Sequence, residues 1–234
     1  MNVFIKIQRR INMVDFLMAS CPIALWIITA VNLAFTALLL TKFRQSKNKI
    51  YLLSCLLTIG LFYDAAILAL GTVMKEGALL LALSRLRYVF HGGLIPLIYA
   101  LCAYALDAKG IWLKLAWVLT GVLSVLGIAD GCIRTLGVQV VAGVTRYASV
   151  YAPAWAEIVN SLLTFGTVIP LMIVGIIVWV KQRTPRLFLA GFFMFAFSCL
   201  GAACLELMFY ISMYGEVLMA AFFYLYAVKK DQKA

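Results

Sequence analysis

The chain has 234 residues, of which 65% are hydrophobic and only 12% are charged. Soluble globular proteins use apolar residues for about half of their length and charged residues for about a quarter, so this composition excludes a soluble fold. The formal net charge of +11 is divided into short basic clusters between apolar runs, which is typical of membrane topology signals and not of a nucleic-acid-binding surface.

Residues 1–12 form a basic tail that carries Lys6, Arg9 and Arg10 and is followed by a second methionine, Met13. Three interpretations are open: a short amphipathic tail, the charged region of a signal peptide, or an over-extended start with true initiation at Met13. A cleaved signal is the least favoured, because the following apolar run is far longer than the roughly 7–15 residues of a signal-peptide core.

Seven apolar runs follow, separated by short loops. A helix needs about 20 apolar residues to cross the hydrocarbon core of a membrane, and each run is close to this length or longer. The predicted spans cover residues 22–40, 50–73, 79–106, 112–132, 154–180, 187–206 and 210–228. We therefore predict an all-α fold, a polytopic membrane bundle of seven transmembrane helices over residues 13–229, followed by a cytoplasmic tail over 230–234.

The segment 133–153 differs in kind from the spans. Its centre, residues 137–147, is rich in β-branched residues and interrupted by glycines, which is typical of a short hairpin. We predict a hairpin outside the bilayer between the fourth and fifth helices, and we treat it as a candidate lid.

The basic residues predict the orientation of the bundle. With seven spans, the first, third and fifth loops and the C-terminus share one side and carry twelve Lys and Arg residues, whereas the other side carries six, or three if translation starts at Met13. Because cytoplasmic loops are enriched in Lys and Arg, we expect the N-terminus outside and the C-terminus inside a cell membrane, a bacterial inner membrane or its equivalent. The basic N-terminal tail opposes this orientation, since it would have to be exported or absent.

One stretch of the third span gathers polar side chains. Ser84, Arg87 and His91 are spaced by three and four residues, so they lie on one stripe of a helix. At a rise of ~1.5 Å per residue, Asp64 of the second span lies at nearly the depth of Arg87. A charge at the centre of a span costs ~2.5–3.5 kcal/mol on insertion scales, so we expect Asp64 and Arg87 to pair inside the bundle.

Two spans contain a glycine followed four residues later by a proline. Gly92 and Pro96 come directly after His91, and Gly166 and Pro170 repeat the spacing in the fifth span. Proline removes one helical hydrogen bond, so we predict a bend at each position and a free carbonyl beside His91. The match is either an ancestral repeat or chance. Paired discontinuous helices of this kind build substrate sites in many transporters.

Further polar residues extend the candidate site. Glu157 and Asn160 lie on a polar face of the fifth span, and Glu216 lies near the outer end of the seventh. The predicted substrate-binding residues are Asp64, Ser84, Arg87, His91, Glu157, Asn160 and Glu216. The competing interpretation is a structural ion-pair network that only holds the helices together.

Catalytic and cofactor motifs are absent from the sequence. The six cysteines form no CxxC pair and there is one histidine, so we predict no metal site and no cofactor. Free thiols are favoured over a bridge between Cys21 and Cys132. Residues 210–228 contain no lysine for a retinal Schiff base, and neither HExxH nor GxSxG occurs. An enzyme is therefore the less favoured class.

These features favour a small-molecule permease or a ligand-binding membrane protein with a polar pocket in its outer half. Two alternatives stay open. One is a membrane sensor or accessory subunit with a structural ion-pair network, and the other is a lipid-modifying enzyme with His91 as general base. The expected partners are the lipid bilayer, a small-molecule ligand, and a membrane partner or a second copy of the chain; nucleic acid is not expected.

Overall fold

The structure is a computed structural model that describes residues 2–232, with side chains described from Val14 onward. Met1 and residues 233–234, which belong to the two predicted tails, lie outside the described residues. The elements in chain order are α1 (Asn2–Ser46), α2 (Lys49–Leu70), α3 (Ala78–Leu94), α4 (Leu97–Ala105), α5 (Gly110–Ile133), β1 (Thr135–Val141), β2 (Val144–Tyr151), α6 (Ala154–Gln182), α7 (Arg186–Ala202), the short 3-10 helix η1 (Leu205–Leu207) and α8 (Met208–Asp231).

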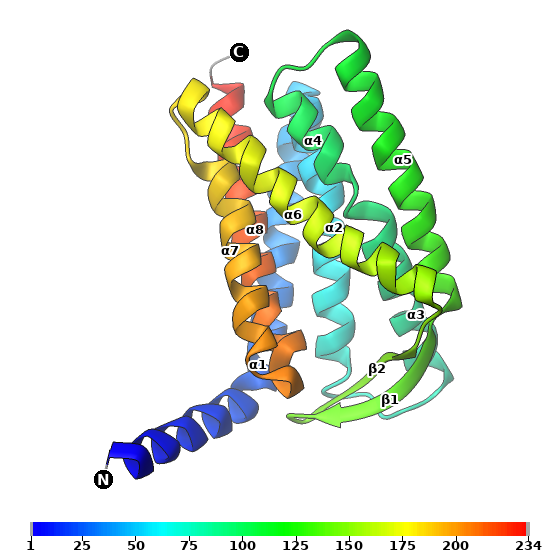
Figure 1. The fold of residues 1–234 in the computed structure, drawn as a ribbon, viewed down its shortest axis with the longest axis vertical. Coiled ribbons are helices and arrows are strands. Elements are labelled where there is room, and N and C mark those ends of the chain that lie inside the picture. Colours follow the sequence, from blue (N-terminus) through cyan, green and yellow to red (C-terminus); the bar gives the residue numbers. More distant parts are fainter. Residues whose placement is uncertain (1, 233–234) are drawn as a thin grey trace.

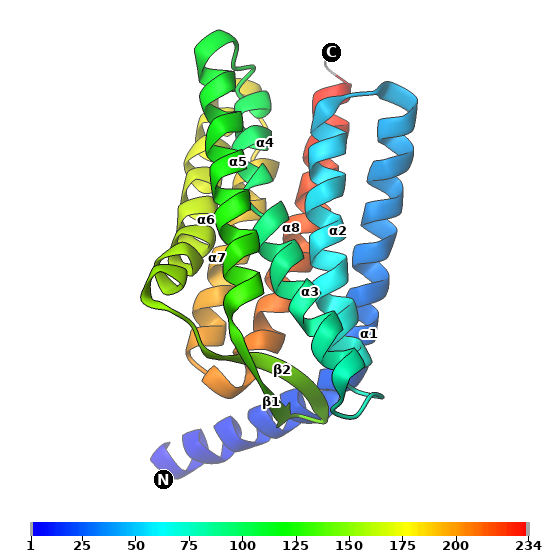
Figure 2. The same ribbon diagram turned by 90° about the vertical axis from the view of Figure 1, so that its right-hand side faces the viewer.

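The helices run alternately up and down in one bundle, with the N-terminus and the hairpin at one end and the C-terminus at the other (Figures 1 and 2). The short loops after α1, α4 and α6 lie at the C-terminal end, and the basic residues predicted for this side lie in these loops and in the adjoining helix ends (Figure 1). The N-terminal turns of α1 diverge from the bundle (Figure 1). This helix contains Pro22, whose missing amide hydrogen weakens the helix and permits a change of direction.

Six helical segments within the described part of the chain are long and apolar enough to cross a membrane, judged by length and composition. They are Val14–Ser46, Lys49–Leu70, Ala78–Ala105, Gly110–Ile133, Ala154–Gln182 and Leu205–Asp231. This finding supports a multi-pass membrane protein. A further apolar helix, α7, has 17 residues, which is at the short end of the ~17–25 residues of transmembrane helices. The count of seven spans therefore stays a prediction.

At the predicted bend in the third span, a two-residue interruption at Ile95–Pro96 separates α3 from α4, although both residues keep helical dihedral angles. Pro96 cannot donate to the Gly92 carbonyl, and this carbonyl lies against Gly127 of α5. Two hydroxyl groups of α5 bond other carbonyls at this position. Ser124 Oγ donates to the Gly93 carbonyl at 2.8 Å, and Thr120 Oγ1 donates to the Pro96 carbonyl at 3.2 Å.

The crossing of α3 and α5 brings two backbones into contact. A Cβ atom on Gly92 would overlap the backbone of Gly127, and a Cβ atom on Gly127 would overlap the backbone of Gly92. Small residues at such crossings allow close packing of helices within a membrane, where burial of apolar area supplies little driving force. The crossing fixes the position of α3, which carries Arg87 and His91.

The fifth predicted span behaves differently from the third. Helix α6 continues through Pro170 without a break. The Gly166 carbonyl, which Pro170 cannot bond, accepts a hydrogen bond from the Tyr99 hydroxyl of α4. The two glycine-proline positions are thus not equivalent: one divides a span into two helices, and the other lies inside a continuous helix that crosses the bundle obliquely (Figure 1).

Two clusters of buried apolar side chains hold the bundle together. The main core lies toward the C-terminal end and joins α1, α2, α4, α6, α7 and α8; its members include Tyr51, Leu57, Leu101, Leu171 and Phe223. The hairpin-side cluster joins α1, α2, α8 and the hairpin, and it includes Cys21, Leu25, Leu68, Val144 and Tyr210.

The predicted hairpin is present as the antiparallel strands β1 and β2, which turn at Ala142 and Gly143. Both turn residues have positive φ angles, as two-residue hairpin turns require. The hairpin packs on the bundle: the Thr145 amide donates to the Gly71 carbonyl at 2.8 Å, and the Val144 side chain is fully buried. A Cβ atom on Gly71 would overlap the Thr145 carbonyl oxygen, so this contact requires glycine.

Candidate functional site

A cavity of about 410 Å³ lies inside the bundle and borders both apolar clusters. Side chains from α2, α3, α4, α6, α7 and α8 line it, and most of them are aliphatic, aromatic or methionine. Its polar lining residues are Asp64, Arg87, His91, Thr164, Thr167, Ser198, Ser212 and Glu216. This volume falls within the ~300–1,000 Å³ of typical small-molecule sites, which are also mostly apolar with a few placed polar groups.

An ion pair crosses the cavity wall between α2 and α3. Arg87 Nε lies 3.0 Å from Asp64 Oδ1, and the two side chains are only 12% and 13% exposed. His91 Nδ1 lies 4.0 Å from the other carboxylate oxygen of Asp64. The pairing of Asp64 with Arg87, predicted from their similar depth, is thus present, and His91 joins it from one helical turn further along α3.

Glu216 of α8 brings a second carboxylate to this group. It lines the cavity, it is 3% exposed, and it interacts electrostatically with Asp64 and Arg87. Its Oε2 atom has no hydrogen-bond partner among the described residues. A buried polar group without a partner costs about 1–3 kcal/mol, and more if it is charged. Such an atom beside a cavity is available to accept a hydrogen bond from water or from a ligand.

The cavity does not include every predicted site residue. Ser84 is buried in α3 but does not line the cavity, and Glu157 and Asn160 are exposed on α6. The face predicted for α6 reaches the cavity only through Thr164 and Thr167. The reason is the oblique path of α6, which carries its first turns away from the bundle axis (Figure 1).

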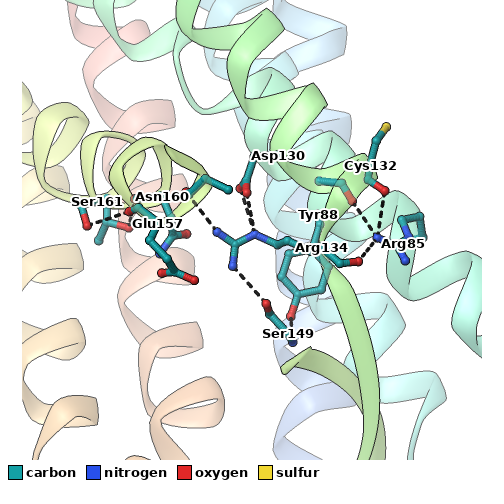
Figure 3. Close-up of polar contacts among 12 residues, drawn as sticks. Arg85, Tyr88, Asp130, Cys132, Arg134, Ser149, Glu157, Asn160 and Ser161 are labelled. Carbon is teal, nitrogen blue, oxygen red and sulfur yellow. Dashed lines mark hydrogen bonds and ion pairs between the residues drawn. The ribbon is translucent and has the colours of Figure 1, made fainter. Parts of the chain in front are cut away.

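A second buried network pairs two residues, Asp130 and Arg134, whose pairing was not predicted from the sequence (Figure 3). Arg134 Nε donates to both Asp130 oxygens at 2.9 Å, and the same guanidinium donates to Ser149 Oγ at 3.2 Å and to the Ala156 carbonyl at 3.4 Å. Asp130 and Arg134 are four residues apart, and this spacing was the available signal. The network ties the end of α5 to β2 and to the start of α6.

Arg85 completes this network from α3 (Figure 3). Its Nη1 atom donates to the carbonyls of Gly131 and Cys132 at 3.2 and 3.1 Å and also to the Arg134 carbonyl. These carbonyls lie at the C-terminal end of α5, where backbone acceptors have no helical partner and attract a cation. Arg85 therefore caps a helix.

The hairpin adds one more cation near the cavity. Arg146 of β2 donates to Gln139 Oε1 at 2.8 Å, and its guanidinium carbon lies 4.1 Å from the centre of the Phe209 ring. Phe209 also lines the cavity. The hairpin therefore touches the cavity wall from the end of the bundle where a lid was predicted.

Two comparisons with known proteins give no relatives: no protein-family model matches the chain, and no curated protein matches it.

In the part of the chain that the structure describes, no group of three or more His, Cys, Asp or Glu side chains is placed to hold a metal ion. Cys21 is buried and Cys132 is exposed, and all six thiols are free.

Proposed function

We propose that this chain is a multi-pass membrane protein of the permease type that binds a small molecule in the cavity between α2, α3, α6, α7 and α8. The observation that supports this most strongly is Glu216 near the Asp64–Arg87 pair: among the residues that the structure describes, its buried Oε2 atom has no hydrogen-bond partner. Asp64, Arg87, His91 and Glu216 form the polar end of the site.

The contrast between the two buried networks favours a ligand site over a purely structural one. The Arg134 guanidinium uses its nitrogen atoms on Asp130, Ser149 and a carbonyl, and none of these residues lines the cavity. The group around Glu216 instead lines a cavity and leaves an acceptor unused. A network that only joins helices gains nothing from such an unused acceptor.

The proposal includes seven spans with the C-terminus in the cytoplasm. Helix α7 packs against α6 and α8 and is apolar apart from Arg186 and Ser198. The basic loops lie at the C-terminal end of the bundle (Figure 1). We expect a reporter active only in the cytoplasm to work when fused after Gln232. We expect the same reporter to be inactive when inserted at Gly143. Activity at Gly143 and not after Gln232 would show that the orientation is the opposite of the proposed one. Activity at both sites would show that the number of spans between them is even, so that the bundle does not have seven spans.

Native mass spectrometry of protein gently extracted from membranes tests the ligand site. We expect the wild-type protein to retain one small molecule and the Ser198→Phe variant to lose it, because Ser198 lines the cavity and a phenyl ring fills part of it. Gly121→Phe is the matched control, since a Cβ atom added there meets nothing within 4 Å among the described residues. A wild-type protein without an adduct, or an adduct that survives Ser198→Phe, would contradict the proposal.

A further inference from the structure

The cavity opens to the side, between α6 and α7. The exposed members of its lining come from these two helices and from the start of α8; they are Thr164, Phe165, Cys199, Ala202 and Met208. The lining residues on α2 and α3 are buried or half-buried. The opening therefore lies on the flank of the bundle.

Helices α6 and α7 are in close contact only toward the C-terminal end. There the Trp179 and Phe188 rings are 5.8 Å apart, and Gly175 packs directly on the Phe188 backbone. Toward the hairpin the two helices diverge (Figure 1). Exposed apolar side chains on these two helices include Leu162 and Leu200. In a membrane-spanning bundle, such a flank faces lipid.

The interior of the cavity divides into an apolar body and a polar end. The body is formed by aliphatic and methionine side chains; they include Leu61, Leu68, Val168, Met194, Met213 and Met219. At the polar end, Asp64 already neutralises Arg87. Glu216 Oε2 is a buried carboxylate oxygen of the lining that has no hydrogen-bond partner in the described part of the chain. A cationic N–H donor is the group that best satisfies a buried carboxylate oxygen.

From this geometry we propose that the ligand is a membrane-dissolved amphiphile with one alkyl chain and a primary ammonium head. It enters between α6 and α7, its head binds Glu216, and its chain lies along the apolar body of the cavity. This inference rests on the proposed function and specifies the ligand class of the same site.

Protection of Cys199 provides the test, because this exposed thiol lines the cavity. Purified protein is incubated with dodecylamine, dodecanol, dodecanoic acid or butylamine and treated with N-ethylmaleimide, and each cysteine is quantified by mass spectrometry. Exposed Cys132 lies outside the cavity and is the internal control. We expect dodecylamine to protect Cys199 at a concentration about tenfold or more below that of dodecanol, as one charge-assisted hydrogen bond predicts. Dodecanoic acid and butylamine are expected to protect least.

The Glu216→Gln variant is expected to raise the protective concentration of dodecylamine about tenfold and to leave that of dodecanol unchanged. Glu157→Gln, on the exposed face of α6, is the matched control. Equal protection by amine and alcohol would contradict the proposed ammonium head group but not the ligand site itself. Protection by butylamine at the same concentration as dodecylamine would contradict the proposed alkyl chain. If none of the probes protects Cys199 selectively, the inference fails, and native mass spectrometry decides separately whether the proposed function also fails.

Discussion

Replacing Asp64 with leucine is expected to lower the free energy of unfolding by about 3–5 kcal/mol, because it leaves the Arg87 guanidinium buried without its carboxylate. Arg87→Met should cost a similar amount for the reciprocal reason. The double variant should recover most of the loss, since two apolar side chains replace the pair and neither charge remains unpaired. Unfolding of purified protein in mixed micelles with rising SDS content measures all four states of this cycle.

The exposed ion pair at the C-terminal end provides the control for this cycle. Lys230 Nζ lies 2.7 Å from Asp107 Oδ2, and the Asp107 side chain is 68% exposed. Lys230→Met should cost no more than about 1 kcal/mol, because solvent screens such a pair. If the double variant at Asp64 and Arg87 loses the sum of the two single losses, the two residues act independently and the pair is not the source of the effect.

Replacing Gly71 with valine is expected to displace the hairpin from the bundle. The new side chain would overlap the Thr145 carbonyl and break the bond between the Thr145 amide and the Gly71 carbonyl. Cys21 is fully buried in the same apolar cluster as Val144 of the hairpin. Its reaction with N-ethylmaleimide should therefore accelerate at least about tenfold, since reaction through opening follows the population of the open form.

Gly121→Val controls for the change from glycine to a β-branched residue, because Gly121 has open space around it. Cysteine-by-cysteine mass spectrometry separates the response of Cys21 from that of Cys132, which is exposed in the folded protein. A Cys21 thiol that stays as unreactive in Gly71→Val as in the wild type would show that the hairpin does not cover it, and the lid interpretation would then be abandoned.

The parts of the fold that follow from the bilayer were predictable from the sequence. The lengths of the apolar runs located the helices, because a span must satisfy its own backbone hydrogen bonds within the bilayer. The β-branched residues and glycines located the hairpin, because strands and tight turns favour these residue types. The helix boundaries were less accurate: α7 ends at Ala202 and η1 follows, where one continuous span over 187–206 was predicted. The backbone of α1 is helical from Asn2, so the predicted tail continues directly into the first span.

The site was predictable only as far as depth along a helix determines it. Asp64 and Arg87 share a depth, and they pair. Glu157 and Asn160 share a helical face with Thr164, but the tilt of α6, which the sequence does not encode locally, leaves them outside the cavity. The position of Glu216 beside the pair depends on how α8 packs against α2, and this is a property of the assembled bundle.

The crossing of α3 and α5 at Gly92 and Gly127 has a mechanical consequence. Backbones in direct contact cannot rotate or slide past one another without collision. Ser124 also bonds α5 to Gly93 of α3, and Thr120 bonds α5 to Pro96 at the junction of α3 and α4. Arg85 of α3 bonds the Gly131 carbonyl at the end of α5, so α3 and α5 are joined there as well. If the proposed permease changes conformation, we therefore expect the change on the α6–α7 side of the cavity, where these two helices diverge toward the hairpin (Figure 1).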